Sequence, residues 1–495
     1  MLKAQLWKYF VNGFLMSLLL LGLVGFAYAA DLMDSLKPDL IFYNGKIITV
    51  DNTFSLAQAV AVKGDKIVAV GKSADLRKLK GSKTQMVDLK GKTVIPGINE
   101  GHLHMMGTGL DIAKIDLRDA KIKKMDDLVQ AVADRVKITP KGEWVEGARW
   151  DQSKLAENRF PTRWDLDKVS PDHPVYLKRT CAHIAVVNSK ALQMAGITKD
   201  TPQPKGGEIV KDEKGEPTGA LLERPAFGQV EKLVPKPNLR QKKEGIKAAC
   251  KAFTAAGITS VNDGGFDAED YQAYQEVMNE GGLTVRVYGL VRVELREISD
   301  DDAIAYLNHL GPRNGFGNDY LRIGGIKITM DGGIGGMTAL QRIPYIAGKP
   351  NNYGIQSIAQ DRLHKIIRLA NKMGWQVAVH CCGGKAMDNV LEVYKAADAE
   401  RPIKGRRFFL VHGYDPSPEN LSDMKRMEVG VATNPHFIHF LGDSFIFNMG
   451  KEWAYKASPH KTYLKNGINI SGGSDSGVTP YLPLGGIYAA VTRRI

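Results

Sequence analysis

Downstream of residue 104, the chain alternates short apolar segments with amphipathic segments of helical period. A helix predicted at 244–256 ends at Gly257, and the apolar run 258–261 follows at once. The helix predicted at 363–373 ends in the same way at Gly374, because glycine readily adopts the left-handed conformation that closes many helices. The predicted strands are 93–98, 258–261, 284–291, 321–329, 376–379, 407–411, 430–433 and 468–470.

This succession predicts an α/β fold with a parallel sheet, because a helix must return the chain before each parallel strand. Eight such units indicate a (β/α)₈ TIM barrel over residues 96–495, and a doubly wound open sheet is the alternative. In a barrel, the side chains that act in function lie at the C-terminal ends of the strands.

An interval of about 110–240 interrupts the repeat after the first barrel strand. This length is too great for a loop, so a large insertion is predicted. An insertion at this point leaves from the C-terminal face, and we expect it to overhang the pocket. Its candidate substrate-binding residues are Trp150, His183 and Asn188, although each of these residue types is equally common in packing or in turns.

Upstream of the barrel, strand-like segments occur at 40–50, 59–70 and 86–94. Turns at Gly64 and Gly91 break two of them, as in β-hairpins. A block of this size cannot close a sandwich by itself. Residues 30–95 are therefore predicted to form the N-terminal part of a β-sandwich.

The first 29 residues have the pattern of a secretory signal peptide. Two lysines precede an uncharged apolar run over 14–27, which ends in the triplet Ala27-Tyr28-Ala29. The run is shorter than the roughly 20 residues that span a bilayer, so we expect cleavage between Ala29 and Ala30 and no stable membrane anchor. Export to the periplasm or outside the cell is predicted.

The formal net charge of +13 is spread along the chain without a sustained basic block. Nucleic-acid binding is therefore not expected, and the charge favours at most a weak attraction for anionic substrates or anionic membranes. Four cysteines form no disulfide framework, and we expect buried free thiols at Cys181, Cys250, Cys381 and Cys382. A small-molecule substrate is the expected partner, and homo-oligomerisation stays open.

Ligand-type side chains recur where the predicted strands end. His102 and His104 are two residues apart, so both point to one face of an extended segment. Later strand ends supply Lys327, His380, His412 and Asp475. Alone, such a histidine is more often structural, such a lysine is a surface charge, and such an aspartate lies in a turn. Their joint placement predicts a divalent metal site at the barrel mouth.

Longer motifs surround these residues. They are Pro96-Gly97 through His104, Asp172-His173-Pro174-Val175, Lys327 with Asp331-Gly332-Gly333, Thr338-Ala339-Leu340 with Pro344-Tyr345, Val379-His380-Cys381-Cys382-Gly383, Val411-His412-Gly413 and Gly473-Ser474-Asp475. Through them, nearly all of the chain after residue 38 resembles the amidohydrolase superfamily of metal-dependent hydrolases, in its amidohydrolase-3 branch, which includes N-substituted formamide deformylase. The resemblance implies a barrel, a sandwich built from both chain ends, and one or two divalent ions, usually Zn²⁺.

The resemblance implies these metal ligands: His102, His104, Lys327, His380, His412 and Asp475. The two histidines of the first strand would hold one ion, with Asp475 beside it, and His380 and His412 would hold the second. Lys327 matches a lysine that many relatives carboxylate. An ammonium cannot bind a metal, whereas the resulting carbamate is an anionic oxygen donor that can bridge two ions.

Several positions depart from the family pattern. Gly384 and Val411 stand where carboxylates are common, which removes two groups that could orient metal-bound imidazoles. Glu100 stands where aspartate is usual. The sequence also stops at residue 495, soon after the eighth strand, so the C-terminal strands of the sandwich are expected to be missing.

These observations lead to the hypothesis of an exported metal-dependent hydrolase that cleaves an amide-type C–N bond in an N-acyl or N-formyl amine. Asp475 would be its general base, taking a proton from water and passing it to the leaving amine. The alternative is a truncated, catalytically inactive relative that acts as a binding protein. Six filled ligand positions favour the enzyme, and the early stop favours the alternative.

Overall fold

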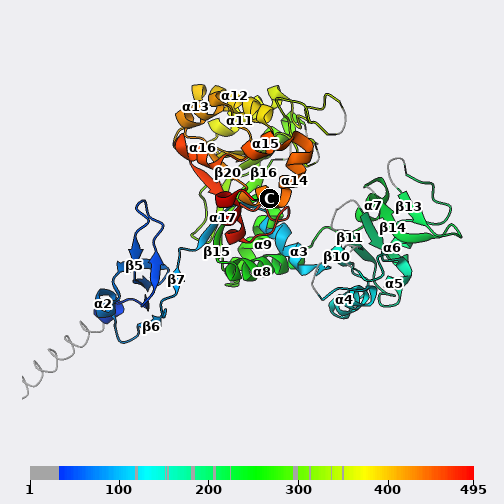
Figure 1. Cartoon of the computed structure of the whole chain (residues 1–495), viewed down its shortest axis with the longest axis horizontal. Coiled ribbons are helices and arrows are strands. Elements are labelled where there is room, and N and C mark those ends of the chain that lie inside the picture. The colour runs from blue at the N-terminus through cyan, green and yellow to red at the C-terminus, as the bar shows by residue number, and fades with distance from the viewer. Residues whose placement is uncertain are drawn as a thin grey trace, which may run out of the picture. The chain divides into compact units, whose positions relative to one another are not determined.

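The computed structural model (Figure 1) describes residues 33–494, except for 118–120, 151, 153–154, 180–183, 205–207, 223, 294–298, 312–313, 336 and 348–349. The chain divides into two compact units, residues 1–97 and 98–495. The predicted signal peptide, with its cleavage point after Ala29, lies outside the described residues. No helix in the described ranges is long and apolar enough to cross a membrane.

The second unit contains a sheet of eight parallel strands that follow one another in chain order. They are β8 (Ile98–Leu103), β15 (Ile258–Phe266), β16 (Arg286–Arg292), β17 (Leu321–Thr329), β18 (Val377–Cys381), β19 (Phe409–His412), β20 (Gly430–Thr433) and β21 (Ile470–Gly472). Beyond β21, the backbone N–H of Asp475 donates to the carbonyl of His102 at 2.8 Å, which joins the last strand to the first. The predicted (β/α)₈ barrel is confirmed, because a doubly wound sheet would not keep chain order.

The first barrel strand differs from its predicted position at 93–98. Thr93 and Val94 form β7 (Thr93–Val94), which pairs with β2 (Lys46–Ile48) in the N-terminal unit. The barrel strand β8 begins only after Pro96-Gly97, because proline has no N–H for a strand ladder. His102 therefore lies on the strand itself, and His104 directly follows it.

Helices return the chain between the barrel strands. Figure 1 shows α11, α12 and α13 on one side of the strands and α8 and α9 on the other. The helices of this part are α3 (Met105–Ala113), α8 (Leu239–Ala255), α9 (Ala268–Asn279), α10 (Asp300–His309), α11 (Gln360–Lys372), α12 (Gly384–Glu400), α13 (Pro418–Met427), α14 (Pro435–Met449), α15 (Lys451–Lys456), α16 (His460–Lys465) and α17 (Pro483–Thr492). As predicted, left-handed glycines follow α8 and α11, with φ of 82° at Gly257 and 90° at Gly374.

Apolar side chains fill the barrel and the layer around it. The barrel interior contains Leu290, Ala378, Phe409, Val411 and Ala432. A larger cluster, which includes the buried Trp375 and Tyr394, fills the space between the strands and their helices. Burying one large apolar side chain contributes roughly 1.5–3 kcal/mol, so this core holds the strand ends and their side chains in place.

Between α3 and α8 the chain forms a second sheet, ordered β13-β14-β12-β11-β10-β9. Its strands are β9 (Ile115–Asp116), β10 (Val145–Trp150), β11 (Val175–Arg179), β12 (Ile184–Val187), β13 (Glu208–Lys211) and β14 (Pro217–Leu222). Its helices are α4 (Met125–Ile138), α5 (Arg163–Asp167), α6 (Ser189–Met194) and α7 (Arg224–Glu231). Two apolar clusters lie within this segment, so the predicted insertion is a folded α/β subdomain.

The N-terminal unit contains two small sheets, ordered β5-β4-β1-β6 and β3-β2-β7. Besides β2 and β7, its elements are β1 (Leu40–Tyr43), β3 (Leu56–Ala57), β4 (Ala59–Lys63), β5 (Lys66–Gly71), β6 (Gln85–Asp88), α2 (Ser73–Leu76) and the 3₁₀ helix η1 (Arg77–Leu79). Among the described residues, no strand of the insertion joins either sheet. That this unit is part of a larger sandwich stays a prediction.

Candidate metal centre

Four histidines converge at the C-terminal ends of three barrel strands. His102 and His104 come from β8 and the residue after its end, His380 from β18 and His412 from β19. The ring centroids of His102 and His104 are 5.3 Å apart, and those of His102 and His412 are 5.8 Å apart. The His380 and His412 centroids are 4.4 Å apart. The structure thus brings together the four predicted histidine ligands.

Lys327 and Asp475 complete the group of six predicted ligands. Lys327 lies on β17, and its Nζ is 3.3 Å from Nε2 of His102. Asp475 follows β21, and its Oδ1 lies 3.6 Å from Nε2 of His102 and 3.4 Å from Nε2 of His104. Lys327, Asp475 and His102 are buried, whereas the side chain of His104 is 39% exposed. Solvent therefore reaches the group beside His104.

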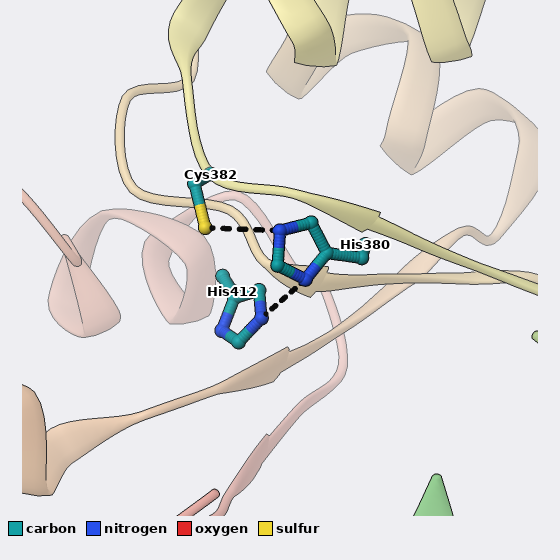
Figure 2. Close-up of side chains that lie close together, drawn as sticks. All are labelled: His380, Cys382 and His412. Carbon is teal, nitrogen blue, oxygen red and sulfur yellow. Dashed lines mark hydrogen bonds between the residues drawn. The ribbon is translucent and has the colours of Figure 1, made fainter. Parts of the chain in front are cut away.

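The pair His380 and His412 has the geometry of two ligands that share a cation (Figure 2). Nδ1 of His412 lies 2.6 Å from the Asn434 side-chain oxygen, to which it must donate, so its Nε2 carries a lone pair. Nε2 of His380 lies 3.3 Å from the Gly332 carbonyl, and in the tautomer that donates to this carbonyl its Nδ1 carries the lone pair. Nε2 of His412 and Nδ1 of His380 are 2.9 Å apart. Two nitrogens at this distance share either a proton or a cation, and metal–nitrogen bonds of about 2.0–2.1 Å allow the spacing.

The other half of the group also fits a cation. Within the described part of the chain, the buried Oδ1 of Asp475 has no hydrogen-bond partner. A buried oxygen without a donor costs about 1–3 kcal/mol, which a metal ion in contact with it would offset. One ligand atom each from His102, His412 and Asp475 lies within 4.8 Å of the other two. The donor set of imidazole nitrogen and carboxylate oxygen is the set that Zn²⁺ accepts.

Burial sets the protonation of these groups. It lowers the pKa of His102 and His412 well below the ordinary value and that of His104 to about 4, so all three are neutral ligands near pH 7. Burial also lowers the pKa of Lys327 to about 8. A larger fraction of its amine is therefore neutral, as carboxylation requires. Burial raises the pKa of Asp475 to about 6, so its carboxylate is a stronger base than usual.

Two of these residues have backbone conformations that L-amino acids rarely adopt. His412 has a φ of 79° and Asp475 a φ of 51°. Such conformations cost of order 1–3 kcal/mol and cluster at functional sites, where the surrounding structure holds them. Here the 2.8 Å hydrogen bond from the backbone N–H of Asp475 to the carbonyl of His102 helps to hold the carboxylate beside the histidines.

The structure gives three residues supporting roles that the sequence did not predict. Asn434, just beyond β20, orients His412 through the hydrogen bond described above. Asp331 accepts backbone hydrogen bonds from Leu340, Cys382 and Gly383 at 2.9–3.0 Å. Its Oδ1 also lies 3.6 Å from Nε2 of His380. These groups stand in for the carboxylates missing at Gly384 and Val411.

Glu100, the third supporting residue, is buried on β8 and accepts a hydrogen bond from the backbone N–H of Ser474. It therefore ties the loop that carries Asp475 to the strand that carries His102. The milder Asp-to-Glu departure at this position thus preserves a carboxylate that fixes the loop. The position of Asn434 and Asp331 just after predicted strands could have marked them as candidates for the site. Their roles could not be predicted, because the groups that they contact come from distant segments.

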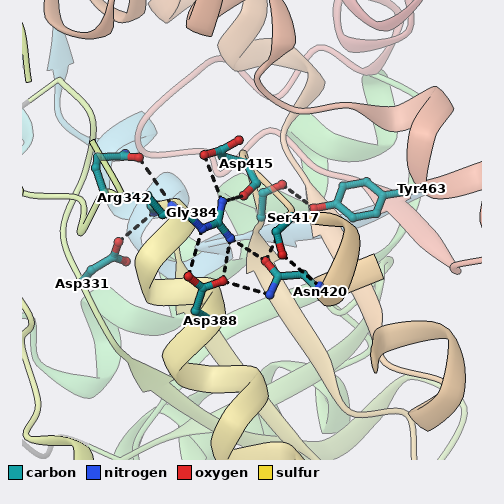
Figure 3. A network of polar contacts seen from close by, with 11 residues as sticks. Asp331, Arg342, Gly384, Asp388, Asp415, Ser417, Asn420 and Tyr463 are labelled. Carbon is teal, nitrogen blue, oxygen red and sulfur yellow. Dashed lines mark hydrogen bonds and ion pairs between the residues drawn. The ribbon is translucent and has the colours of Figure 1, made fainter. Parts of the chain in front are cut away.

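A polar network centred on Arg342 joins the segments after three ligand-bearing strands (Figure 3). The guanidinium donates to both carboxylate oxygens of Asp388 on α12, at 2.9 and 2.6 Å. It also donates to the Asp415 carbonyl at 2.9 Å and to the Asn420 side chain at 2.8 Å. Arg342 follows β17, Asp388 follows β18, and Asp415 and Asn420 follow β19. The network therefore fixes the loops beside Lys327, His380 and His412 relative to one another.

Among the described cysteines, Cys250, Cys381 and Cys382 are buried free thiols, as expected, and Cys181 lies outside the described residues. Sγ of Cys382 lies 3.5 Å from Nε2 of His380 (Figure 2). Burial raises the pKa of Cys382 well above its ordinary value, which keeps the thiol protonated. Cys382 thus packs against the metal-centre residues as a neutral group.

Two of the residues predicted to bind substrate, Trp150 and Asn188, are buried within the insertion. Trp150 is fully buried in the core of the insertion, and its Nε1 donates to the Leu177 carbonyl at 3.0 Å, so it supports the fold rather than a pocket. The buried Asn188 caps α6 by accepting from the backbone N–H of Ala191. The predicted residue His183 lies outside the described residues. Tryptophan and asparagine often line pockets, but they also fill protein cores and cap helices, so residue type alone does not identify a binding residue.

Comparison with known proteins agrees with this geometry. The model of the amidohydrolase family matches residues 85–495. A Bacillus subtilis protein named as the amidohydrolase YtcJ is 33% identical, over 92% of this chain and 84% of that protein. N-substituted formamide deformylase of Arthrobacter pascens is 27% identical, over the same shares of 92% and 84%.

A solved structure, an uncharacterized metal-dependent hydrolase from Pyrococcus furiosus, superposes with a TM-score of 0.73. It is 28% identical, and the match covers 92% of this chain and 89% of that one. The resemblance drawn from the motifs is confirmed. The chain therefore belongs to the amidohydrolase family, as a metal-dependent hydrolase that acts on carbon–nitrogen bonds.

Proposed function

We propose that this chain hydrolyses the amide-type C–N bond of a small N-acyl or N-formyl amine with water activated at a divalent metal centre. The observation that carries the proposal is the convergence of six ligand-type side chains, with ring nitrogens of His380 and His412 only 2.9 Å apart. The name of the Arthrobacter pascens relative, N-substituted formamide deformylase, supports the N-formyl class.

The proposed ligands divide into two sets. His102, His104 and Asp475 would hold one Zn²⁺, and His380 and His412 would hold a second, with a carboxylated Lys327 between them. When bound, the ions would polarise the substrate carbonyl and lower the pKa of water towards neutrality. The buried amine of Lys327, with its pKa lowered to about 8, supports carbamate formation near neutral pH.

Asp475 is the proposed general base. Its Oδ1 is near Nε2 of both His102 and His104, at the side of the group that solvent reaches. A carboxylate whose pKa is raised to about 6 can accept a proton from the attacking water and return it to the leaving amine. Asp475 would therefore serve both as a ligand and in proton transfer.

We also propose that residues 1–29 direct export and are removed between Ala29 and Ala30. The pattern of lysines, apolar run and small residues supports this step. Expression of the full chain in a bacterium, followed by fractionation and mass determination of the N-terminus, tests it. A product in the periplasm or medium that begins at Ala30 is expected, and a cytoplasmic product that retains Met1 would contradict it.

The test of the enzyme uses purified protein loaded with Zn²⁺, and the parent is compared with two single variants. Lys327→Met removes the proposed bridging group, and Lys242→Met removes another buried lysine that pairs with Asp270. Release of free amine from N-formyl and N-acyl amines should require Lys327 but not Lys242. Bound Zn²⁺ in the parent should exceed that in Lys327→Met. Parent protein that binds Zn²⁺ and these amides without turnover would establish the binding-protein alternative instead.

A further inference from the structure

Arg292 is the last residue of β16, and its strand directs it towards the mouth of the barrel. Successive strand residues alternate faces, and Leu290, two positions earlier, lies in the barrel interior with Tyr288 packed against the same cluster. Arg292 is also the register partner of Lys327 on β17, and partners in a parallel pair share a face. Its side chain therefore leaves the strand on the same side as the metal ligands.

Two glycines at the end of β15 determine where this guanidinium lies. A Cβ at Gly265 would come within 2.6 Å of Nη2 and 3.0 Å of Nε of Arg292. A Cβ at Gly264 would come within 2.3 Å of Cε1 of His102. Because both positions are glycine, the guanidinium of Arg292 packs on the backbone of Gly265 and the imidazole of His102 on that of Gly264. Arg292 therefore lies beside the metal ligands.

The charge of Arg292 acts on the same group. After burial and Lys327, Arg292 is a further cause of the lowered pKa of His104, and it contributes in the same direction at Lys327 itself. Arg292 is exposed, as is part of His104. The guanidinium therefore stands on the side of the centre that solvent reaches.

This cation has no anionic partner in the described part of the chain, where its side chain makes no ion pair or hydrogen bond. By contrast, the guanidinium of Arg342 is bound by Asp388. A guanidinium without an anionic partner attracts anions, and its planar donors match a carboxylate through two parallel hydrogen bonds. One guanidinium carries a single positive charge, which the single negative charge of a carboxylate balances.

We propose that Arg292 binds a carboxylate on the substrate, so that the preferred substrates are N-acyl or N-formyl amines that carry a free carboxylate near the scissile bond. The inference rests on the proposed function and narrows its substrate class. Neutral amides of the same shape would bind the centre without this contact.

The test compares N-formylphenylalanine with its neutral carboxamide, which has nearly the same shape. For Arg292→Gln, loss of a charge-assisted pair should lower kcat/KM for the acid roughly ten- to a hundredfold. The carboxamide should change by less than about threefold, within the range of a lost neutral contact. The control Arg286→Gln lies at the opposite end of the same strand and should leave both values unchanged. Equal losses for acid and carboxamide, or no loss for the acid, would overturn the proposal.

A binding measurement separates this inference from the proposed function. Phenylacetate and phenylacetamide are compared by ligand-observed NMR on the Zn²⁺-loaded parent and on Arg292→Gln. Tighter binding of phenylacetate in the parent, with the preference lost in the variant, supports the anion site even if neither formyl compound is hydrolysed. If the variant still prefers phenylacetate, the metal rather than Arg292 binds the carboxylate, and the proposal is wrong.

Discussion

Asn434 offers the most direct test of how this chain orients a metal ligand without the usual carboxylate. Its side-chain oxygen accepts from Nδ1 of His412 at 2.6 Å, and both residues are buried. Asn434→Leu keeps a similar volume but removes the acceptor. The His412 ring must then either leave its Nδ1 proton unsatisfied or move that proton to Nε2, where it blocks the lone pair.

Both outcomes have a calculable cost. An unsatisfied buried donor costs about 1–3 kcal/mol. Removing such an outer partner typically lowers metal affinity by about 10–100-fold, which corresponds to roughly 1.4–2.8 kcal/mol. We therefore expect Asn434→Leu to weaken Zn²⁺ binding by about 10–100-fold, with the barrel still folded.

The measurement is a Zn²⁺ titration against a chromogenic chelator, with circular dichroism to verify folding. The matched control is Asn371→Leu, because Asn371 is buried on α11 and donates to the carbonyls of Ala397 and Arg401 at 2.9 and 2.8 Å. It should lose comparable stability without losing Zn²⁺ affinity. Parental Zn²⁺ affinity in folded Asn434→Leu, or an equal loss in Asn371→Leu, would refute the reasoning.

Three further predictions concern the same centre. Asp475→Asn keeps the shape but cannot accept a proton, so turnover should fall at least about a hundredfold. Metal content, measured by mass spectrometry, should fall much less, and turnover near the parental rate would assign the proton transfer to another group. In protein stripped of metal by a chelator, acidification should lower the free energy of unfolding less in His104→Gln than in the parent. Folding lowers the pKa of His104 from 6.5 to about 4. The stability that depends on a neutral His104 is therefore present above pH 6.5 and is lost as the pH falls through 4. Superimposable denaturant curves for the two proteins across that window would contradict this. Lysine cannot keep all hydrogen-bond partners of the Arg342 guanidinium, so Arg342→Lys should lower the free energy of unfolding by about 1–2 kcal/mol. The control Arg322→Lys, in an exposed ion pair, should change it by less than about 0.5 kcal/mol. Equal urea midpoints for both variants would show that the network adds no stability.

The barrel could be predicted because its signals are local. Gly257 and Gly374 end helices at positions that any window of the sequence reveals, and the apolar run that follows each of them becomes a barrel strand. The first strand was misplaced because 93–98 is apolar on both sides of Pro96-Gly97, and pattern alone does not tell which side joins the barrel. The sheet of the insertion was not predicted, since its order places β14 beside β12 and β13, which only the folded chain brings together.

The six proposed ligands could be found because a barrel places all strand ends at one mouth, so residue type and position in the repeat suffice. The supporting residues depend on contacts across the chain. Asp331 meets the backbone of Cys382 some fifty positions later, and Glu100 meets that of Ser474 across nearly the whole barrel. The burial of Trp150 also depends on distant contacts, because the core around it is built by strands far apart in sequence.

The missing carboxylates and Arg292, which has no anionic partner among the described residues, have a common electrostatic consequence. At His412 the outer partner is a neutral amide, that of Asn434, and Val411 and Gly384 supply no charge. Asp331 supplies a carboxylate beside His380, whereas the neutral partner of His412 leaves more of the positive charge of bound ions and of Arg292 uncompensated. A desolvated cation is costly unless an anion pairs with it. A carboxylate on the substrate would supply this negative charge while the substrate is bound. Its pairing with Arg292 would therefore contribute binding energy at the metal centre itself.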